Sequence, residues 1–201
     1  TSTNNQDDEI STLALKNKIK YFRGDELDVM SRFLEVSKLE NADILVRVTG
    51  DNPLTDPIVM DQMIKSHITN KAEYTFTEDL PHGTRSEVID KKAMMKCHKL
   101  IEDKNSTEYM SLMFNRPDFF KINKFQVTSK KLKRPDVSLT VDTEQDYEII
   151  NKILEYFKKD PHDLEEVIKC YDNLPSTLKR KKTDSHLQNL NRINVSFKSD
   201  V

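Results

Sequence analysis

The sequence predicts an α/β fold of three layers, in which helices cover both faces of a mostly parallel sheet. Short apolar runs typical of buried strands alternate with segments whose apolar residues recur every three or four positions, as in amphipathic helices. Several of the helical segments begin at an aspartate, a residue that favours helix starts. Strands joined by helices in this way form mostly parallel sheets, because a helical crossover returns the chain to the same end of the sheet.

The N-terminal part of the chain contains two predicted helices and one predicted strand. The first helix, residues 7–18, carries acids in its first turn, where they complement the helix dipole. A short strand is predicted over residues 20–23, and Gly24 ends it. Asp25 is placed to cap the second helix. The apolar positions at helical spacing are Ile10, Leu13 and Ala14 in the first helix and Val29, Met30, Phe33 and Leu34 in the second.

The clearest strand is residues 44–48, whose apolar run is interrupted only by Arg47. A continuous apolar run is typical of a parallel strand that is covered on both faces. Asp56 and Pro57 then supply a cap and a first-turn proline for the next helix. Further strands are predicted at residues 74–77, 86–89, 120–127 and 137–141, and further helices at residues 91–103, 107–115, 144–158 and 163–171.

Composition narrows the class of protein. The chain has 33% charged residues but a formal net charge of −2, so it has no overall basic field to hold a nucleic acid. It contains no apolar run of about 18 residues, the length that a membrane-spanning helix needs. Its two cysteines, Cys97 and Cys170, form no C-x-x-C pair, which favours a reducing compartment and neither zinc nor a disulfide scaffold. We therefore expect a cytoplasmic protein without a nucleic-acid partner or membrane insertion.

We predict a single α/β domain over residues 1–173. Residues 77–119 interrupt the alternation of strands and helices, and we interpret them as an excursion that builds one side of a ligand pocket or a contact with a second subunit. Residues 174–201 combine a proline, a basic run and scattered apolar residues, which predicts a weakly ordered tail. Thr1 is not a methionine, and residues 1–5 resemble the loop after a strand, so we also expect an N-terminal truncation.

Two aspartates carry the chemistry that the sequence predicts. Asp51 and Asp142 each follow a run of β-type residues, at the corner where a strand passes into a loop. In open α/β sheets, ligands bind beyond the carboxyl ends of the strands, so carboxylates from two neighbouring strands can meet at one cation. Mg²⁺ is the expected ion, since it binds one or two carboxylates together with substrate phosphates and water.

Each aspartate also has a purely structural interpretation. Asp51 lies between Gly50 and Asn52-Pro53, where its side chain could anchor an Asx turn. Asp142 or Thr143 could cap the helix that follows. The occurrence of both aspartates directly after β-branched strands favours the functional interpretation.

Longer segments resemble a known family. Residues 21–33 (YFRGDELDVMSRF) and 42–57 (ADILVRVTGDNPLTDP) are similar to two segments of the cytidylyltransferases that make CMP-sugars, with the spore coat polysaccharide biosynthesis branch as the nearest match. This group includes the synthetases that activate acylneuraminate and 3-deoxy-manno-octulosonate sugars. Shorter matches follow in the same order over nearly the whole chain, at residues 81–83, 87–88, 107–108, 120–122, 139–143, 146–150, 193–194 and 197–199.

The resemblance implies a Rossmann-like fold of the nucleotide-diphospho-sugar transferase type. It implies a cytidylyltransferase reaction in which a sugar hydroxyl attacks the α-phosphate of CTP, giving a CMP-sugar and pyrophosphate for polysaccharide or glycan synthesis. Asp51 and Asp142 match the family positions that hold Mg²⁺ and are the expected catalytic residues. The expected partners are CTP, a small sugar acceptor and a second copy of the chain. The expected substrate-binding residues are Arg23, Gly83, Arg85 and Glu87, with loop bracing as the alternative for Arg23 and a solvent-facing position as the alternative for Glu87.

Three departures from the family pattern affect these expectations. The strand and phosphate-binding loop that open family members have no counterpart here, so these 201 residues alone are expected to bind CTP weakly. Arg85 stands where relatives have an aspartate, which predicts an acidic acceptor sugar, unless Arg85 points to solvent or pairs with Glu78, Asp79 or Glu87. Tyr109 replaces a histidine. The alternatives are a catalytically impaired binding or assembly module and a glycosyltransferase of the same fold, although the D-x-D motif of the latter is missing at residues 51–53.

Overall fold

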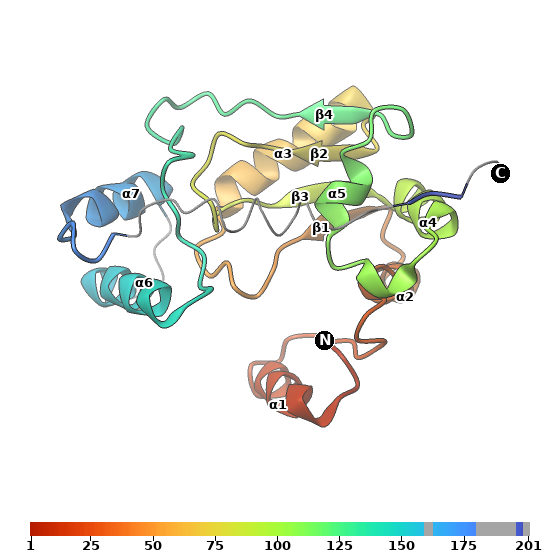
Figure 1. The fold of residues 1–201 in the computed structure, drawn as a ribbon, viewed down its shortest axis with the longest axis horizontal. Coiled ribbons are helices and arrows are strands. Elements are labelled where there is room, and N and C mark those ends of the chain that lie inside the picture. The colour runs from red at the N-terminus through yellow and green to blue at the C-terminus, as the bar shows by residue number, and fades with distance from the viewer. Residues whose placement is uncertain (159–162, 180–195, 199–201) are drawn as a thin grey trace. The chain divides into compact units, whose positions relative to one another are not determined.

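A computed structural model describes residues 1–158, 163–179 and 196–198 of the chain (Figure 1). Its strands, β1 (Ile44–Arg47), β2 (Tyr74–Phe76), β3 (Glu87–Asp90) and β4 (Ile122–Lys124), form one sheet in the order β1-β3-β2-β4. The helices are η1 (Asn5–Asp7), α1 (Asp8–Lys16), α2 (Val29–Leu39), α3 (Pro57–Asn70), α4 (Lys91–Leu100), η2 (Lys104–Ser106), α5 (Met110–Phe114), α6 (Glu144–Phe157) and α7 (Leu164–Asn173). The predicted α/β class is confirmed.

The pairing of β1 with β3 departs from a purely parallel sheet. The Lys91 N–H donates to the Asp43 carbonyl at one end of this pair, and Arg47 contacts Glu87 at the other. Residue numbers therefore rise along one strand as they fall along the other, which is antiparallel pairing. The mostly parallel character of the whole sheet stays a prediction.

The chain divides into two compact units. The first contains Thr1–Leu45, Ile89–Ile122 and the described residues of Asn194–Val201, and the second contains Val46–Val88 and the described residues of Asn123–Ile193. The predicted single domain over residues 1–173 stays a prediction. Most of the predicted tail, residues 180–195 and 199–201, lies outside the described residues.

The core of the first unit lies where α2 packs on α4. Its buried side chains include several methionines, which fill irregular space well because their side chains are unbranched. Cys97 is buried among them, and this burial raises the pKa of its thiol to about 12, so it stays protonated. Residues 196–198 pair with the end of α4 through a bridge between Ile101 and Phe197. The other buried core residues are Met30, Ala93, Met94, Met110, Met113, Phe114 and Phe120.

The second unit is built around α3, β2 and the pair α6 and α7. α3 begins with Pro57 after Asp56, whose side chain accepts the Val59 N–H at 2.6 Å, as the sequence predicted. α6 begins with a capping box between Thr143 and Asp146 and packs on α7. Its buried side chains include Met63, Tyr74, Leu80, Val88, Leu139, Ile149, Ile150, Ile153, Val167 and Ile168.

Two predicted strands are wrong. Residues 20–23 form no strand, and the only pairing there is an isolated bridge between Ser2 and Gly24. Residues 137–141 also form no strand, although Ser138 makes an isolated parallel bridge with His82. Both segments have β-type side chains but no neighbouring strand that extends far enough to form a ladder.

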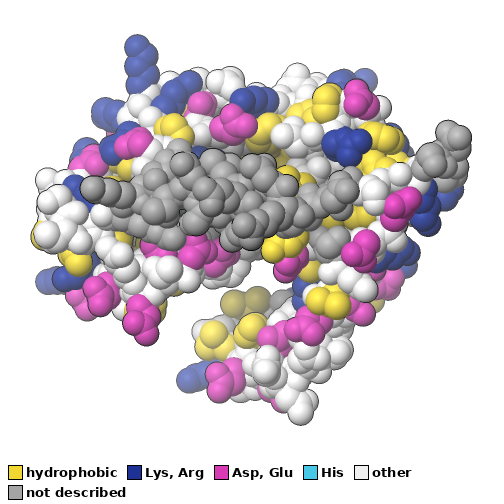
Figure 2. All heavy atoms as spheres, viewed as in Figure 1, with side chains coloured by type: hydrophobic (Ala, Val, Ile, Leu, Met, Phe, Trp, Pro, Cys, Tyr) yellow, Lys and Arg dark blue, Asp and Glu magenta, His cyan; other side chains and the backbone are white. Residues whose placement is uncertain are grey.

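The start of α2 and the packing of α1 also differ from expectation. Asp28, and not Asp25, caps α2 by accepting the Ser31 N–H at 3.0 Å. Ile10 and Leu13, two of the apolar residues at helical spacing, are 55% and 61% exposed. Hydrophobic side chains are visible on the surface of the part of the molecule that Figure 1 labels α1 (Figure 2). The helical period of the sequence therefore predicted α1 correctly, but it did not predict whether the apolar face of the helix is buried.

Basic and acidic side chains are interspersed on the face of the molecule that Figure 2 shows. None of the helices within the described ranges combines the length and the apolar character needed to cross a membrane.

Candidate active site

Three loops of the second unit meet at one place. They are the loop after β1, the loop between β2 and β3, and the segment that leads into α6. The Val141 N–H donates to the Asp51 carbonyl at 2.9 Å, which joins the first loop to the third. The Leu139 N–H donates to the His82 carbonyl at 2.7 Å, which joins the third loop to the second. We call this meeting of residues 49–56, 80–85 and 137–143 the aspartate corner.

Asp51 is exposed at this corner, and its backbone is held firmly. The nearest polar group to its carboxylate is the Thr140 hydroxyl, 3.3 Å from Oδ2, a long contact that is also shared with the Asp51 carbonyl. An Asx turn would need an N–H two residues further on, and residue 53 is a proline, which has none. The structural alternative for Asp51 is therefore wrong.

Asp142 lies next to Val141 and so within the same corner. Its N–H donates to the Asp146 carboxylate at 3.2 Å, while its side chain is exposed. The cap of α6 is Thr143, whose hydroxyl accepts the Asp146 N–H at 3.3 Å. Asp142 is therefore not needed to cap the helix. The backbone contact between residues 51 and 141 brings the two predicted metal ligands to the same corner.

The donor atoms of the corner fit a hard divalent cation. The side chain of Asn52 donates to the Thr49 hydroxyl at 2.7 Å, but its Oδ1 is buried and has no hydrogen-bond partner among the described residues. A buried acceptor without a donor is costly, and a cation or a ligand N–H would satisfy it. In the described part of the chain, no group of three or more His, Cys, Asp or Glu side chains could hold a metal alone. Two carboxylates with further oxygens match Mg²⁺, which takes its remaining ligands from phosphate and water.

Gly83 explains why the second loop can approach the third loop so closely. Its φ is +88°, in the left-handed region that favours glycine. A Cβ at this position would lie 2.3 Å from the Thr140 nitrogen and 2.4 Å from the Leu139 carbonyl carbon. Only a glycine fits here, so Gly83 sets the spacing of the corner. Its predicted contact with substrate stays a prediction.

Arg85 ends the same loop with a half-buried guanidinium group. Its Nε and Nη2 donate to the Leu80 carbonyl at 2.9 and 2.6 Å. Burial lowers the pKa of Arg85, while the nearby charges of Glu78 and Asp79 oppose this shift. Arg85 forms none of the ion pairs found among the described residues, so the predicted alternative of a salt bridge is wrong.

Glu87, the predicted sugar ligand, lies in a polar network across three strands. Its carboxylate contacts Arg47 Nη1 at 2.6 Å and also accepts a hydrogen bond from the Tyr74 hydroxyl. Burial and the charge of Glu87 raise the pKa of Tyr74 well above its ordinary value. Sequence reasoning missed Arg47 and Tyr74 as partners of Glu87. The signal was available for Arg47, since it is the only charged residue inside the apolar run of residues 44–48.

Arg23, the predicted nucleotide ligand, belongs to the first unit and braces its N-terminal loop. Its guanidinium group donates to the carbonyls of Ser2 and Asn4, each at 2.8 Å, and contacts the Asp8 carboxylate at 2.7 Å. The guanidinium group therefore contacts three partners in its own loop region, which agrees with the alternative interpretation that Arg23 braces a loop.

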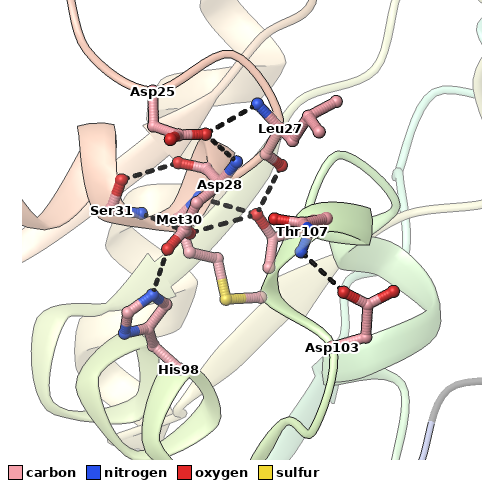
Figure 3. A network of polar contacts seen from close by, with 9 residues as sticks. Asp25, Leu27, Asp28, Met30, Ser31, His98, Asp103 and Thr107 are labelled. Carbon is pink, nitrogen blue, oxygen red and sulfur yellow. Dashed lines mark hydrogen bonds and ion pairs between the residues drawn. The ribbon is translucent and has the colours of Figure 1, made fainter.

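A second polar cluster, which we call the capping network, lies in the first unit (Figure 3). His98 reaches from α4 to the Asp28 carboxylate, with 2.7 Å between Nε2 and Oδ2. Thr107 is fully buried and accepts the Met30 N–H at 3.1 Å, while its hydroxyl lies 3.3 Å from both the Leu27 carbonyl and the Asp28 carboxylate. Sequence reasoning did not find this network, because its members come from three separate segments.

Comparison with known proteins supports the family resemblance. The chain is 30% identical over 176 residues to an uncharacterized protein of Methanocaldococcus jannaschii, covering 87% of this chain and 72% of that protein. It is 29% identical over 155 residues to the spore coat polysaccharide biosynthesis protein SpsF of Bacillus subtilis, covering 76% of this chain and 64% of SpsF. The chain therefore spans slightly less than two thirds of SpsF.

The fold is similar to a solved structure. A cytidylyltransferase from Leptospira borgpetersenii superposes with a TM-score of 0.81 at 24% sequence identity, over 91% of this chain and 78% of that one. The family model described as cytidylyltransferase matches residues 1–183. The predicted enzyme class, a nucleotidyltransferase, is confirmed at the level of the family. Since this match covers most of its length, the chain belongs to the cytidylyltransferase family.

Proposed function

We propose that this protein transfers CMP from CTP to a hydroxyl group of an acidic sugar, for the synthesis of a surface polysaccharide or glycan. The hydroxyl oxygen bonds to the α-phosphorus, the bond from that phosphorus to the β-phosphate oxygen breaks, and pyrophosphate leaves. The hydroxyl proton is released. The observation that carries this proposal is the meeting of the Asp51 and Asp142 segments at one corner of a cytidylyltransferase-family chain.

Mg²⁺ is the proposed cofactor, with Asp51 and Asp142 as its protein ligands. When bound, the ion would neutralise the charge of the triphosphate and align its α-phosphate for displacement. The protein contributes rigid placement, because the hydrogen bond from Val141 fixes the backbone of Asp51 and the capping box fixes the turn that follows Asp142. Asn52 Oδ1 is available to a metal-bound water or to a donor group of the substrate.

The other proposed site residues take supporting roles. Gly83 holds the second loop against the third, and Glu87 contributes a carboxylate whose orientation Arg47 and Tyr74 fix. Arg23 braces the N-terminal loop of the first unit. The polysaccharide context is supported by the similarity to SpsF, a spore coat polysaccharide biosynthesis protein. A homodimer and a cytoplasmic location are part of the same proposal.

The test is pyrophosphate release by the full-length protein with CTP and Mg²⁺. The acceptors are N-acetylneuraminate and 3-deoxy-manno-octulosonate as acidic sugars and glucose as a neutral control, and mass spectrometry identifies the CMP-sugar. We expect product with an acidic sugar, none with glucose, and none after chelation of the metal. Release of CDP or transfer of a sugar from a nucleotide-sugar would instead identify a glycosyltransferase. Binding of CTP without any product would identify a binding module.

A further inference from the structure

Arg85 forms no direct ion pair among the described residues. Three carboxylates near it in sequence were its partners in the alternative interpretation, and each contacts another cation instead. Glu78 lies 2.5 Å from Lys124, Asp79 lies 3.4 Å from Lys133, and Glu87 lies 2.6 Å from Arg47. Glu78 and Asp79 still attract Arg85, but neither carboxylate forms an ion pair with it.

The Arg85 guanidinium is held in one orientation with one edge still available. Both of its contacts, from Nε and Nη2, go to the Leu80 carbonyl. A guanidinium group has five N–H donors, so the end formed by Nη1 and the second hydrogen of Nη2 can still bind two oxygens of one anion. Carboxylate and phosphate groups both have the two-oxygen geometry that this end recognises.

The loop that carries Arg85 is part of the aspartate corner. The Asp56 N–H donates to the Thr84 carbonyl at 3.2 Å, next to Arg85 in the chain. Gly83 lies against Thr140, which in turn contacts Asp51. Arg85 is therefore fixed to the same rigid set of loops as the proposed metal ligands, although half of it is removed from water. Burial of a guanidinium group without a direct ion pair is unfavourable, and an anionic ligand at its free end would reduce this cost.

We infer that Arg85 binds the anionic group of the acceptor sugar, a carboxylate or a phosphate, through the free end of its guanidinium. The assignment of this anion to the acceptor rests on the proposed function. The binding itself does not, since it is measured without CTP or metal.

The direct test follows the Nε–Hε resonance of Arg85 by NMR in the full-length protein. The resonance is identified by its loss in Arg85→Gln. N-acetylneuraminate and glucose 6-phosphate serve as carboxylate and phosphate probes, and glucose is the neutral control. We expect the resonance to shift in a saturable way with at least one anionic sugar and not with glucose, and the probe with the higher affinity identifies the anion. No shift with either anionic sugar, or the same shift with CTP alone, would overturn the inference.

Arg134 provides a matched control in the same unit. Its guanidinium contacts Asp136 at 2.9 Å and Asp172 at 2.8 Å, so both of its sides are occupied by carboxylates. Its Nε–Hε resonance, identified with Arg134→Gln, should not move with any of these sugars. A shift of equal size at Arg134 would mean general screening by an anion, which contradicts a specific site at Arg85.

Kinetics test the same inference independently. Arg85→Gln should raise the KM for the acidic acceptor by about 10- to 100-fold, the loss expected for charge-assisted hydrogen bonds, with little change in the KM for CTP. Arg85→Lys keeps the charge but loses the fork and should give an intermediate value, while Arg134→Gln should behave as wild type. Equal effects on both substrates would reject the assignment to the acceptor.

The two proposals can fail separately. If an anionic sugar shifts Arg85 and no pyrophosphate forms, the anion site stands and the proposed transfer is wrong. If CMP is transferred to a neutral sugar and Arg85→Gln has a normal KM, the transfer stands and the inference about Arg85 is wrong. Thermal unfolding of each variant shows whether a lost signal reflects lost structure.

Discussion

Asp28 in the capping network and Asp51 in the aspartate corner both lie near the start of a loop-to-helix transition, yet their surroundings differ. The side chain of Asp28 is 14% exposed and contacts the Ser31 N–H, the His98 ring and the Thr107 hydroxyl. Asp51 is exposed and has one long contact, from Thr140. The protein itself satisfies the first carboxylate, whereas the second remains available to a ligand.

This difference separates polar groups that hold the fold from those that can act on a substrate. A carboxylate whose oxygens already accept several hydrogen bonds has little capacity left for a metal. An exposed carboxylate on a fixed backbone loses little conformational entropy when it binds a cation, because its backbone position is already set. The buried Asn52 Oδ1 of the corner also has no partner in the described part of the chain, so it too is available to a ligand.

The largest expected effect is on turnover at the aspartate corner. Asp51→Asn and Asp142→Asn should each lower the rate of pyrophosphate release at least about 100-fold, since charge stabilisation by a metal ion is worth several kcal/mol. Thermal unfolding of both variants separates lost turnover from lost structure, and Asp51→Asn should unfold at the wild-type temperature, because the Thr140 hydroxyl can donate to an amide oxygen as it does to the carboxylate. Asp61→Asn, an exposed aspartate on α3, is the control and should keep full activity. Wild-type rates in both corner variants would remove the metal assignment.

The spacing of the corner depends on one glycine. Gly83→Ala should lower the free energy of unfolding by about 2 to 4 kcal/mol, from a strained φ and a clash with the backbone of Leu139 and Thr140. Gly50→Ala is the matched control, since nothing lies within 4 Å of its added Cβ. Urea denaturation measures both. Similar values for the two variants would mean that the close approach at Gly83 is not required.

The capping network should respond in stability. Thr107→Val keeps the shape of the side chain but removes the hydroxyl, which leaves the buried Met30 N–H without its acceptor. We expect a loss of about 1 to 3 kcal/mol in the free energy of unfolding. Thr12→Val, at an exposed position of α1, should change it by less than about 0.5 kcal/mol. An unchanged free energy of unfolding in Thr107→Val would show that the network does not hold α2 in place.

The smallest expected effect concerns pH. Hydrogen bonds from Ser2 and Thr1 lower the pKa of Asp7 from its usual 3.8 to about 2. The stabilisation from this lowered pKa is fully present above pH 3.8 and is lost as the pH falls toward 2, because the unfolded chain takes up the proton first. NMR titration of the Asp7 carboxyl carbon should show a midpoint near pH 2, and Asp7→Asn should lose less stability than wild type between pH 4 and pH 2. A midpoint near 3.8 would contradict these hydrogen bonds.

Local signals in the sequence predicted much of the fold and part of the site. The helix that follows Thr143 was predicted from its apolar face, and the structure adds the capping box that starts it. Asp56 with Pro57 gave the start of α3 for the same reason, since a cap and a first-turn proline act within a few residues. The rule that ligands bind beyond strand ends paired Asp51 with Asp142, and the two segments do meet, although residues 137–141 form an isolated bridge and no strand, so the rule holds for Asp51 and not for Asp142.

Contacts between distant segments were not predictable in this way. The pairing of His98 with Asp28, and of Glu87 with Arg47 and Tyr74, joins residues far apart in the sequence. The β-type run at residues 137–141 formed no strand, because strand formation needs a partner that a single segment does not reveal. The apolar face of α1 is exposed for a similar reason, because a helical period does not reveal which segment, if any, packs on it.

The sequence by itself therefore determined the helices with strong periods and caps and the α/β class, because these depend on interactions within a few residues or on the order of elements along the chain. Tertiary structure alone decided which polar side chains are satisfied. Asp28 and Glu87 contact partners from other elements, while the three carboxylates near Arg85 in sequence contact Lys124, Lys133 and Arg47. The physical reason is that a charge pairs with whichever opposite charge the fold brings within reach, and only the folded chain sets those distances.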